Sequence, residues 1–259
     1  YCWRGGQRSG SFASILDQIG WRAQTVAGGY QTYRRLVSQV LYDDPLPHRQ
    51  LILLDGNTGT GKTAILERLQ SRGLQTIDLE ALAHHRGSLL GRRSGDQPSQ
   101  KGFETALVMA LDACDPTQPV MLEAESSKIG TINLPPSLWA AMCAAPRIMV
   151  TAELTSRATF LAETYHDVAL DPDRVRESLG MLRRVRGHAT VDTWCALLDA
   201  GQFVDLAAAL MADHYDAAYA KSRGAQEFAL LGTVHAPTLD AQGLDQITDE
   251  IAAMITPAS

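Results

Sequence analysis

The sequence predicts an α/β fold, in which helices cover both faces of a parallel sheet. Two observations predict it. Short apolar runs typical of buried strands alternate along the chain with longer segments of helical periodicity, as in parallel sheets. The first apolar run, residues 51–54, also leads through a glycine-rich loop directly into a helical segment. The 259 residues, 45% of them hydrophobic and 20% charged, suffice for one large domain or two smaller ones.

The expected elements fall into two regions around a turn-rich stretch, Asp-Asp-Pro-Leu-Pro at residues 43–47, which breaks helices. Before it we expect a polar loop at residues 2–8 and helices at residues 9–19 and 31–42. The strands expected after it are residues 51–54, 76–79, 120–123, 148–150 and 228–231. The helices expected after it are residues 62–72, 101–113, 155–166, 173–186 and 203–220. We therefore divide the chain into residues 1–44, too few to bury a core of their own, and residues 45–259.

Composition excludes several classes of protein. No apolar run approaches the ~20 residues that cross a bilayer, so we expect no membrane span and no membrane partner. The four cysteines lie far apart, without the spacing of a zinc site or a disulfide framework, which predicts a cytoplasmic setting. Because the net charge is -6, a nucleic-acid partner needs local basic surface. Arginines gather at residues 86–93 and 174–186, where solvated faces are the alternative interpretation.

An eight-residue glycine-rich motif follows the first predicted strand and opens the next helix. It is Gly56-Asn57-Thr58-Gly59-Thr60-Gly61-Lys62-Thr63, which fits G-x-x-x-x-G-K-[ST]. Glycines let backbone N–H groups turn around phosphate oxygens, and the helix N-terminus adds a favourable field. Lys62 supplies a charge for the terminal phosphates and Thr63 a hydroxyl for Mg²⁺. The motif predicts a P-loop that binds a di- or triphosphate, and a P-loop NTPase-like sheet in residues 45–259.

Carboxylates follow the predicted strands at the edge where a P-loop ligand would lie. They are Asp78, Glu80, Glu123 and Glu125. Their oxygens suit Mg²⁺ or its water ligands, and acid or base catalysis is the other use of such groups. Glu123 and Glu125 fit well because they end an apolar strand. A carboxylate that caps the following turn is the alternative at these positions.

Cys2 begins a second loop that runs into a helix, Cys2-Trp3-Arg4-Gly5-Gly6-Gln7-Arg8-Ser9. Such a loop can point backbone N–H groups and the helix dipole at one sulfur. This lowers the pKa of the thiol and stabilises a persulfide-type anion. Arg4 and Arg8 would add positive charge. Cys2 is therefore the candidate catalytic residue, and a cysteine without a role is the alternative.

The two motifs together resemble a known arrangement. Residues 2–9 are similar to the active-site loop of rhodanese domains, and Gly28-Gly29-Tyr30 to the end of that domain. A rhodanese-like module joined to a P-loop domain resembles the bacterial tRNA 2-selenouridine synthase family. Further blocks that resemble this family are Asp78-Leu79-Glu80, His85-Arg86-Gly87-Ser88 with Gly91, Gln97-Pro98-Ser99-Gln100-Lys101-x-Phe103-Glu104, Glu123-x-Glu125-Ser126-x-x-Ile129-Gly130 and His214-Tyr215-Asp216-x-x-Tyr219.

This resemblance implies a transferase that acts on the wobble uridine of certain tRNAs, in the anticodon stem-loop. In the family, 2-thiouridine is S-geranylated from geranyl diphosphate, and selenium from selenophosphate then displaces the geranylthio group. The P-loop would hold a phosphorylated donor, and Cys2 would handle the chalcogen. The resemblance also implies that residues 1–44 are the C-terminal part of a rhodanese-like domain whose first half is absent from this sequence. At Ala217 the family pattern leads us to expect proline.

Selective RNA recognition usually places unpaired bases on aromatic rings or arginine faces. The candidates for tRNA or substrate contact are Arg4, Arg8, Arg86, Arg92, Arg93, Trp139, Arg183 and Tyr215. Each has an alternative as surface charge or core residue, and we favour Arg86 first.

Three other functions fit parts of the sequence. A P-loop small-molecule kinase would use residues 56–63 and Glu123, and ATP consumption without tRNA would favour it. A rhodanese-type sulfurtransferase with a regulatory NTPase would use Cys2 to form thiocyanate from thiosulfate. A nucleotide-gated interaction module would dock partners on the acidic C-terminal region.

Overall fold

In the computed structural model, which describes residues 2–43, 50–165, 171–224 and 227–255, five parallel strands form one sheet in the order β2-β3-β1-β6-β7. The strands are β1 (Leu51–Gly56), β2 (Gln75–Ile77), β3 (Val120–Glu123), β6 (Arg147–Ala152) and β7 (Leu230–Ala236). A small antiparallel hairpin joins β4 (Lys128–Ile129) to β5 (Ile132–Asn133). The predicted α/β fold with a parallel, P-loop-like sheet is confirmed.

The helices form three groups. Those around the sheet are α3 (Lys62–Ser71), α4 (Leu79–Leu82), α5 (Gln100–Asp112), α6 (Pro136–Ala144) and α14 (Ala241–Ile255). A helical unit contains α7 (Leu154–Thr164), α9 (Pro172–Met181), α10 (Arg183–Arg186), α11 (His188–Asp199), α12 (Phe203–Leu210), the π-helical turn η2 (Met211–Tyr215) and α13 (Asp216–Gly224). The N-terminal group contains α1 (Gln7–Gln18), α2 (Gly29–Ser38) and the π-helical turn η1 (Gln39–Asp43).

Side chains of β1 alternate between the two faces of the sheet, as strand geometry requires. Leu51 and Leu53 enter the core on one face, and Ile52 and Leu54 enter the core on the other. Every residue of β1 is buried, since the strand lies in the middle of the sheet. A strand covered on both faces needs a continuous apolar run, which is what residues 51–54 provide.

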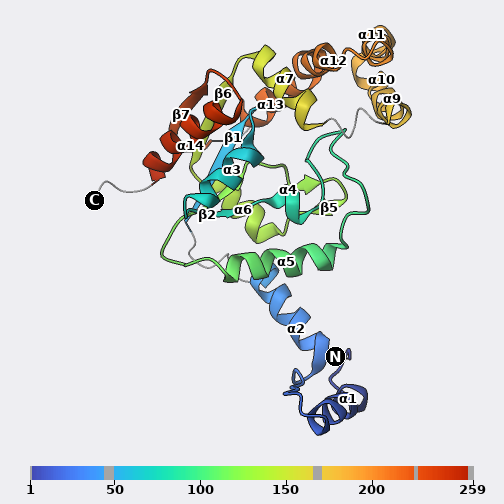
Figure 1. Cartoon of the computed structure of the whole chain (residues 1–259), viewed down its shortest axis with the longest axis vertical. Coiled ribbons are helices and arrows are strands. Elements are labelled where there is room, and N and C mark those ends of the chain that lie inside the picture. Colours follow the sequence, from blue (N-terminus) through green and yellow to red (C-terminus); the bar gives the residue numbers. More distant parts are fainter. Residues whose placement is uncertain (1, 44–49, 166–170, 225–226, 256–259) are drawn as a thin grey trace.

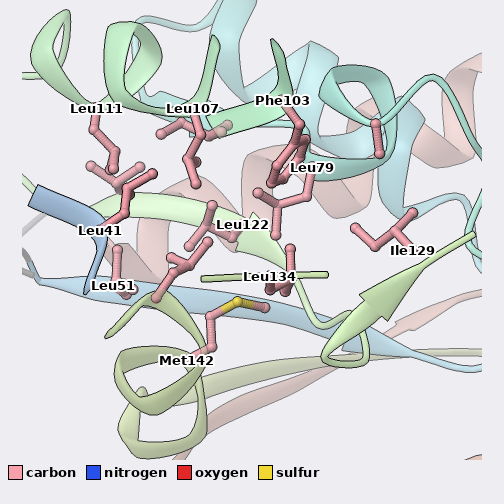
Figure 2. Close-up of a cluster of buried hydrophobic side chains, with 14 of the residues drawn as sticks. Leu41, Leu51, Leu79, Phe103, Leu107, Leu111, Leu122, Ile129, Leu134 and Met142 are labelled. Carbon is pink, nitrogen blue, oxygen red and sulfur yellow. The ribbon is translucent and has the colours of Figure 1, made fainter. Parts of the chain in front are cut away.

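The core on the first face joins η1, α5 and α6 to the sheet. Figure 2 shows Leu41 and Leu107 on the same side of the sheet as Leu51 and Leu122, with Met142 of α6 beside them. Val37 and Leu41 are almost completely buried in this core. The end of α2 and the turn η1 are therefore anchored in the hydrophobic core of the sheet.

The opposite face is covered by α3 and α14, whose apolar residues pack on β1, β6 and β7. The helical unit has a core of its own around Trp194, and Leu89 and Leu90 from the loop after α4 pack against it. Figure 1 shows the helical unit at one end of the molecule and α1 at the other, beyond α2 and α5. The sheet therefore lies between the helical unit and the N-terminal group.

Several element boundaries differ from the prediction. The strand expected at residues 228–231 is found at Leu230–Ala236, because its pairing with β6 continues through polar, exposed residues of an edge strand. The strand expected at residues 76–79 ends at Ile77, and Asp78 caps α4. The helices expected at residues 31–42 and 203–220 each contain a π-helical turn. Most of the predicted linker 43–47, and residue 166, lie outside the described residues, and the boundary after residue 44 stays a prediction.

Candidate functional site

A pocket of about 700 Å³ lies beside the carboxyl ends of β1 and β3. Ligands of open parallel sheets bind at this edge. The P-loop residues Thr58 to Thr63 line one side of the pocket, and Glu123 and Glu125, which follow β3, line another. Side chains of α7, η2 and α13 form a further wall. The helical unit therefore completes a site that the sheet begins.

The glycines of the P-loop give it the shape that the motif predicts. Gly59 and Gly61 have positive φ angles of 82° and 77°, which favour residues without a Cβ atom. A Cβ atom on Gly59 would lie 2.8 Å from the carbonyl oxygen of Arg157, closer than such atoms approach. Inside the loop, the Thr60 hydroxyl donates a hydrogen bond of 2.9 Å to the carbonyl of Asn57. The loop is therefore a compact turn that admits no larger side chain at Gly59.

Two arginines outside the motif hold the P-loop in place. Arg157 of α7 donates from Nη1 to the carbonyl of Thr58 at 3.1 Å and forms a bidentate ion pair with Asp216 of α13. Arg223 donates from Nη2 to Oδ1 of Asn57 at 2.6 Å. Because Arg157 is only 6% exposed, its charge depends on Asp216 for compensation. The helical unit thus contacts the loop through charged groups as well as through the pocket wall.

A buried ion pair supports the base of the loop. Asp55, the residue before Gly56, is 2% exposed and accepts from Nη1 of Arg147 at 2.9 Å. Its other oxygen accepts from the Gly56 N–H at 2.7 Å and from Nε of Arg223 at 3.3 Å. These bonds fix the direction in which the chain leaves β1.

Lys62 points back along the loop. Its Nζ donates to the carbonyl of Gly56 at 2.9 Å and lies 5.5 Å from the centre of the Tyr219 ring. Burial acts to lower the pKa of Lys62, but Tyr219 and the carboxylates of Glu125 and Glu80 outweigh it. The pKa is therefore raised, and the amine remains a cation that can bind phosphate.

The predicted carboxylates take different positions. Glu80, Glu123 and Glu125 line the pocket, whereas Asp78 does not and caps α4 by accepting from the Ala81 N–H at 2.6 Å. Glu123 accepts from the Glu80 N–H at 2.7 Å through Oε1, while its buried Oε2 has no hydrogen-bond partner among the described residues. Burial, followed by repulsion between neighbouring carboxylates, raises the pKa of Glu80 and Glu123. The pocket therefore concentrates carboxyl groups that favour a cation or a proton among them.

Gly87 makes room for this carboxylate group. Its φ angle is +63°, and a Cβ atom there would lie 2.6 Å from Oε1 of Glu80 and 2.7 Å from Oε2 of Glu125. Glycine is the residue type that satisfies both the backbone angle and the close approach.

The far wall of the pocket is aromatic and aliphatic. It contains Phe160, Leu161 and Tyr165 from α7 and its end, with Tyr215 and Tyr219 from η2 and α13. The Tyr165 hydroxyl lies 3.4 Å from that of Ser88, which ties this wall to the loop after α4. A phosphate cradle and an apolar wall therefore share one cavity.

The basic candidates separate into two groups. Arg86 and Arg93 line the pocket, and the Arg86 guanidinium lies 4.6 Å from the centre of the Tyr165 ring. Arg92 and Arg183 do not line it. Arg92 is exposed, and Arg183 pairs with Asp192 at 2.7 Å on the helical unit.

Two further candidates from the same set, Trp139 and Tyr215, also line the pocket.

Cys2 precedes α1 in the N-terminal group and is not among the residues that line the pocket; Figure 1 shows α1 at the opposite end of the molecule from the helical unit. Its sulfur accepts from the Gly6 N–H at 3.0 Å, and its carbonyl accepts from the N–H of Tyr30 at 3.1 Å. The Ser9 hydroxyl, above all, and nearby backbone N–H groups lower the pKa of Cys2 to about 7. Arg4 and Arg8 belong to the same group and are exposed. The Cys2 loop and the P-loop are therefore two separate candidate reaction sites.

Sequence reasoning missed Arg157, Arg223 and Asp55, which hold the P-loop. The block from His214 to Tyr219 was noticed as a resemblance and for Tyr215 as an RNA-contact candidate, and three of its residues reach the site. Tyr215 and Tyr219 line the pocket, and Asp216 pairs with Arg157. Ala217, where proline was expected, is exposed and follows directly on the π-helical turn η2. The clustering of charged and aromatic residues in this block was the available signal.

In the parts of the chain that the structure describes, no group of three or more His, Cys, Asp or Glu side chains is arranged to hold a metal ion on its own. Among the same residues, no helix is both long and apolar enough to cross a membrane.

Comparisons with known proteins agree with the resemblance. The family model described as the tRNA 2-selenouridine synthase AAA domain matches residues 49–234. The tRNA 2-selenouridine synthase of Alcanivorax borkumensis is 41% identical over 167 residues, which are 64% of this chain and 45% of that protein. That of Hahella chejuensis is 41% identical over 180 residues, 68% of this chain and 46% of that protein.

The protein of the same name from Aeromonas salmonicida is 38% identical over 173 residues, 66% of this chain and 45% of that protein. The matched part of the chain thus spans less than half the length of these curated relatives. Since the family model covers well over half of the residues, the chain belongs to the tRNA 2-selenouridine synthase family, through its AAA domain.

Proposed function

We propose that this chain converts wobble 2-thiouridine of tRNA into 2-selenouridine through an S-geranyl intermediate. Geranyl diphosphate and selenophosphate are the donors, and a tRNA anticodon stem-loop in the cytoplasm is the acceptor. The observation that carries the proposal is the pocket itself, in which a P-loop faces an aromatic and aliphatic wall. The loop would hold the diphosphate of an isoprenyl donor, and the aromatic and aliphatic wall would hold its hydrocarbon chain.

Geranyl transfer would use the P-loop as follows. The C2 sulfur of the uridine attacks the first carbon of the geranyl group, the carbon–oxygen bond breaks, and diphosphate leaves. Lys62 and the N–H groups of the loop stabilise the charge that develops on diphosphate. Phe160 and Tyr219 shield the reacting carbon from water. Arg86 and Arg93, which line the same pocket, would contact the RNA.

The pocket suits a magnesium ion bound together with phosphate. Mg²⁺ prefers oxygen ligands and commonly takes only one or two from the protein, with the rest from phosphate and water. The buried, unpartnered Oε2 of Glu123 and the Thr63 hydroxyl that lines the pocket fit this pattern. Thr63, Glu123 and Glu125 would hold the ion. When bound, it would neutralise charge on the diphosphate.

Selenium incorporation would use Cys2. Its lowered pKa gives a nucleophilic thiolate near neutral pH, which suits a residue that carries selenium or sulfur. The positive charges of Arg4 and Arg8 would attract selenophosphate and the RNA backbone. Because Cys2 does not line the P-loop pocket, the two steps would take place at different sites.

A small-molecule kinase is the second candidate, since Lys62 and the carboxylates of Glu123 and Glu125 also fit a nucleoside triphosphate with Mg²⁺. The aromatic wall could then stack on the nucleotide base, but the Cys2 loop is left without a role. ATP consumption in the absence of RNA would favour it.

Nucleoside mass spectrometry tests the proposal. The chain is incubated with a 2-thiouridine anticodon stem-loop, Mg²⁺, geranyl diphosphate and selenophosphate, with each donor added alone and together. We expect Lys62→Ala to abolish geranylation, because the diphosphate loses its charge partner, and Cys2→Ser to spare geranylation while blocking selenouridine. Geranylation retained in Lys62→Ala would remove the P-loop from the mechanism, and selenouridine retained in Cys2→Ser would remove Cys2.

A further inference from the structure

A second, smaller cavity of about 60 Å³ lies between α7, α9, α11 and α12. Among the described residues its lining is aliphatic or aromatic, and the hydroxyl of Tyr165 is the one polar group of those side chains. The lining side chains are Leu90, Leu161, Ala162, Tyr165, Val175, Leu198, Phe203, Leu206, Ala207 and Leu210. Apolar surfaces of this kind favour hydrocarbon groups over water.

This cavity adjoins the P-loop pocket. Leu161 and Tyr165 line both spaces, and they are four residues apart, so they lie on the same side of α7 and its end. Phe160, on the pocket side, is also close to the position that a Cβ atom on Gly61 would occupy. Leu161 and Tyr165 of α7 and its end therefore lie between the P-loop pocket and the small cavity, and both are largely apolar.

The size and chemistry of the cavity restrict its occupant. One ordered water needs about 10–15 Å³ of such volume, so the cavity holds roughly four to six non-hydrogen atoms. A base, a ribose or a phosphate would lose hydrogen bonds there without replacement. A branched five-carbon unit has the matching size and needs no polar partner.

We propose that this cavity binds the distal isoprene unit of a linear isoprenyl diphosphate whose diphosphate lies on the P-loop, and that it sets the preferred chain length. The inference rests on the proposed geranyl transfer and adds the residues that select the donor. Leu161 and Tyr165, which line both spaces, would contact the chain, and Ala207 and Leu206 of α12 would contact its distal unit. A five-carbon donor would leave the cavity empty, and a fifteen-carbon donor would exceed it.

Calorimetric titration of the chain in the presence of Mg²⁺ tests this assignment. The four ligands are inorganic diphosphate, dimethylallyl diphosphate, geranyl diphosphate and farnesyl diphosphate. Ala207→Leu fills the cavity, so we expect the ratio of geranyl to dimethylallyl affinity to fall at least about tenfold, as for steric exclusion from an apolar pocket. Ala208→Leu adds the same atoms to the next residue of α12, which does not line the cavity, and should leave the ratio unchanged. Phe203→Ala enlarges the cavity and should raise the ratio of farnesyl to geranyl affinity.

The outcomes separate the two proposals. An unchanged ratio in Ala207→Leu, or equal affinity of the wild-type chain for all four diphosphates, would overturn the cavity assignment and leave the P-loop assignment standing. Failure of the wild-type chain to bind any of the four would overturn both. If thermal unfolding shows that Ala207→Leu does not fold, Phe203→Ala becomes the test of the assignment. An unchanged ratio of farnesyl to geranyl affinity in Phe203→Ala would then overturn it.

Discussion

Polar groups at the start of α1 give Cys2 its chemistry. The Gly6 N–H donates to the sulfur at 3.0 Å, and the Ser9 hydroxyl is the largest influence that lowers the pKa of the thiol to about 7. Backbone N–H groups at the start of α1 act in the same direction, while burial opposes them. Each of these groups stabilises the thiolate more than the thiol. The Cys2 thiol should therefore ionise near neutral pH without a neighbouring base.

We expect the alkylation rate of Cys2 to rise with pH and reach half its maximum near pH 7, because the thiolate is the reactive form. Ser9→Ala removes the largest stabilising contact and should move this midpoint upward. Ser11→Ala, which changes an exposed serine of the same helix, is the matched control. Peptide mapping after iodoacetamide treatment gives the rate at Cys2 alone. A midpoint that is the same in Ser9→Ala as in the control would contradict the assignment.

Among the elements, the P-loop depends most on backbone shape. Gly59 and Gly73 have similar φ angles, 82° and 85°. They differ in surroundings, since a Cβ atom on Gly59 would meet Met211 at 2.7 Å and the Arg157 carbonyl at 2.8 Å, whereas one on Gly73 has nothing within 4 Å. Alanine substitutions at these two glycines therefore separate the effect of backbone strain from the effect of close contacts with the new Cβ atom.

Gly59→Ala should weaken diphosphate binding more than about tenfold, because displacement of the loop loses charge-assisted hydrogen bonds to phosphate worth ~1.5–3 kcal/mol each. Gly73→Ala introduces backbone strain that should lower the free energy of unfolding by ~1–2 kcal/mol. It should leave diphosphate affinity unchanged. Calorimetric titration with inorganic diphosphate, together with thermal unfolding of both variants, makes the comparison. Equal losses of affinity would mean that global stability, and not loop shape, governs binding.

The same element shows how far sequence reasoning reaches. The P-loop was predictable because its chemistry lies in eight consecutive residues, and its carboxylate neighbours because parallel strands end at one edge. The groups that hold it were not, because Arg157 is 59 residues from Asp216 along the chain and 99 from Thr58. The pocket positions of Phe160 and Leu161 were equally unpredictable, since an apolar residue in a helix is as typical of a core as of a pocket wall. Asp78 was misleading for a local reason: the residue after a strand can cap the next helix.

At the scale of the whole molecule, the attachment of the N-terminal group matters for the proposed two-step chemistry. Arg34 of α2 forms an ion pair with Glu104 of α5, and the Tyr42 hydroxyl donates to the same carboxylate at 2.7 Å. Leu41 is 0% exposed and packs in the core that also contains Leu51 of β1. The end of α2 and the turn η1 are therefore part of the folded core of the P-loop unit.

This arrangement predicts a large effect of Leu41→Ala on the stability of the P-loop unit. The substitution removes buried apolar atoms and leaves a cavity, which should lower the free energy of unfolding by about 2–5 kcal/mol. Leu36→Ala makes the same change one helical turn and one residue earlier, at a side chain that is 57% exposed, and should alter it by less than about 0.5 kcal/mol. Denaturant unfolding followed by tryptophan fluorescence gives the change in the free energy of unfolding for both variants. Diphosphate binding is measured at the same denaturant concentrations. Because Leu41 shares a core with β1, binding and fluorescence should be lost at one midpoint. If Leu41→Ala behaved like Leu36→Ala, the N-terminal group would be a separately folding attachment, and the geometry between Cys2 and the P-loop would not be fixed by this core.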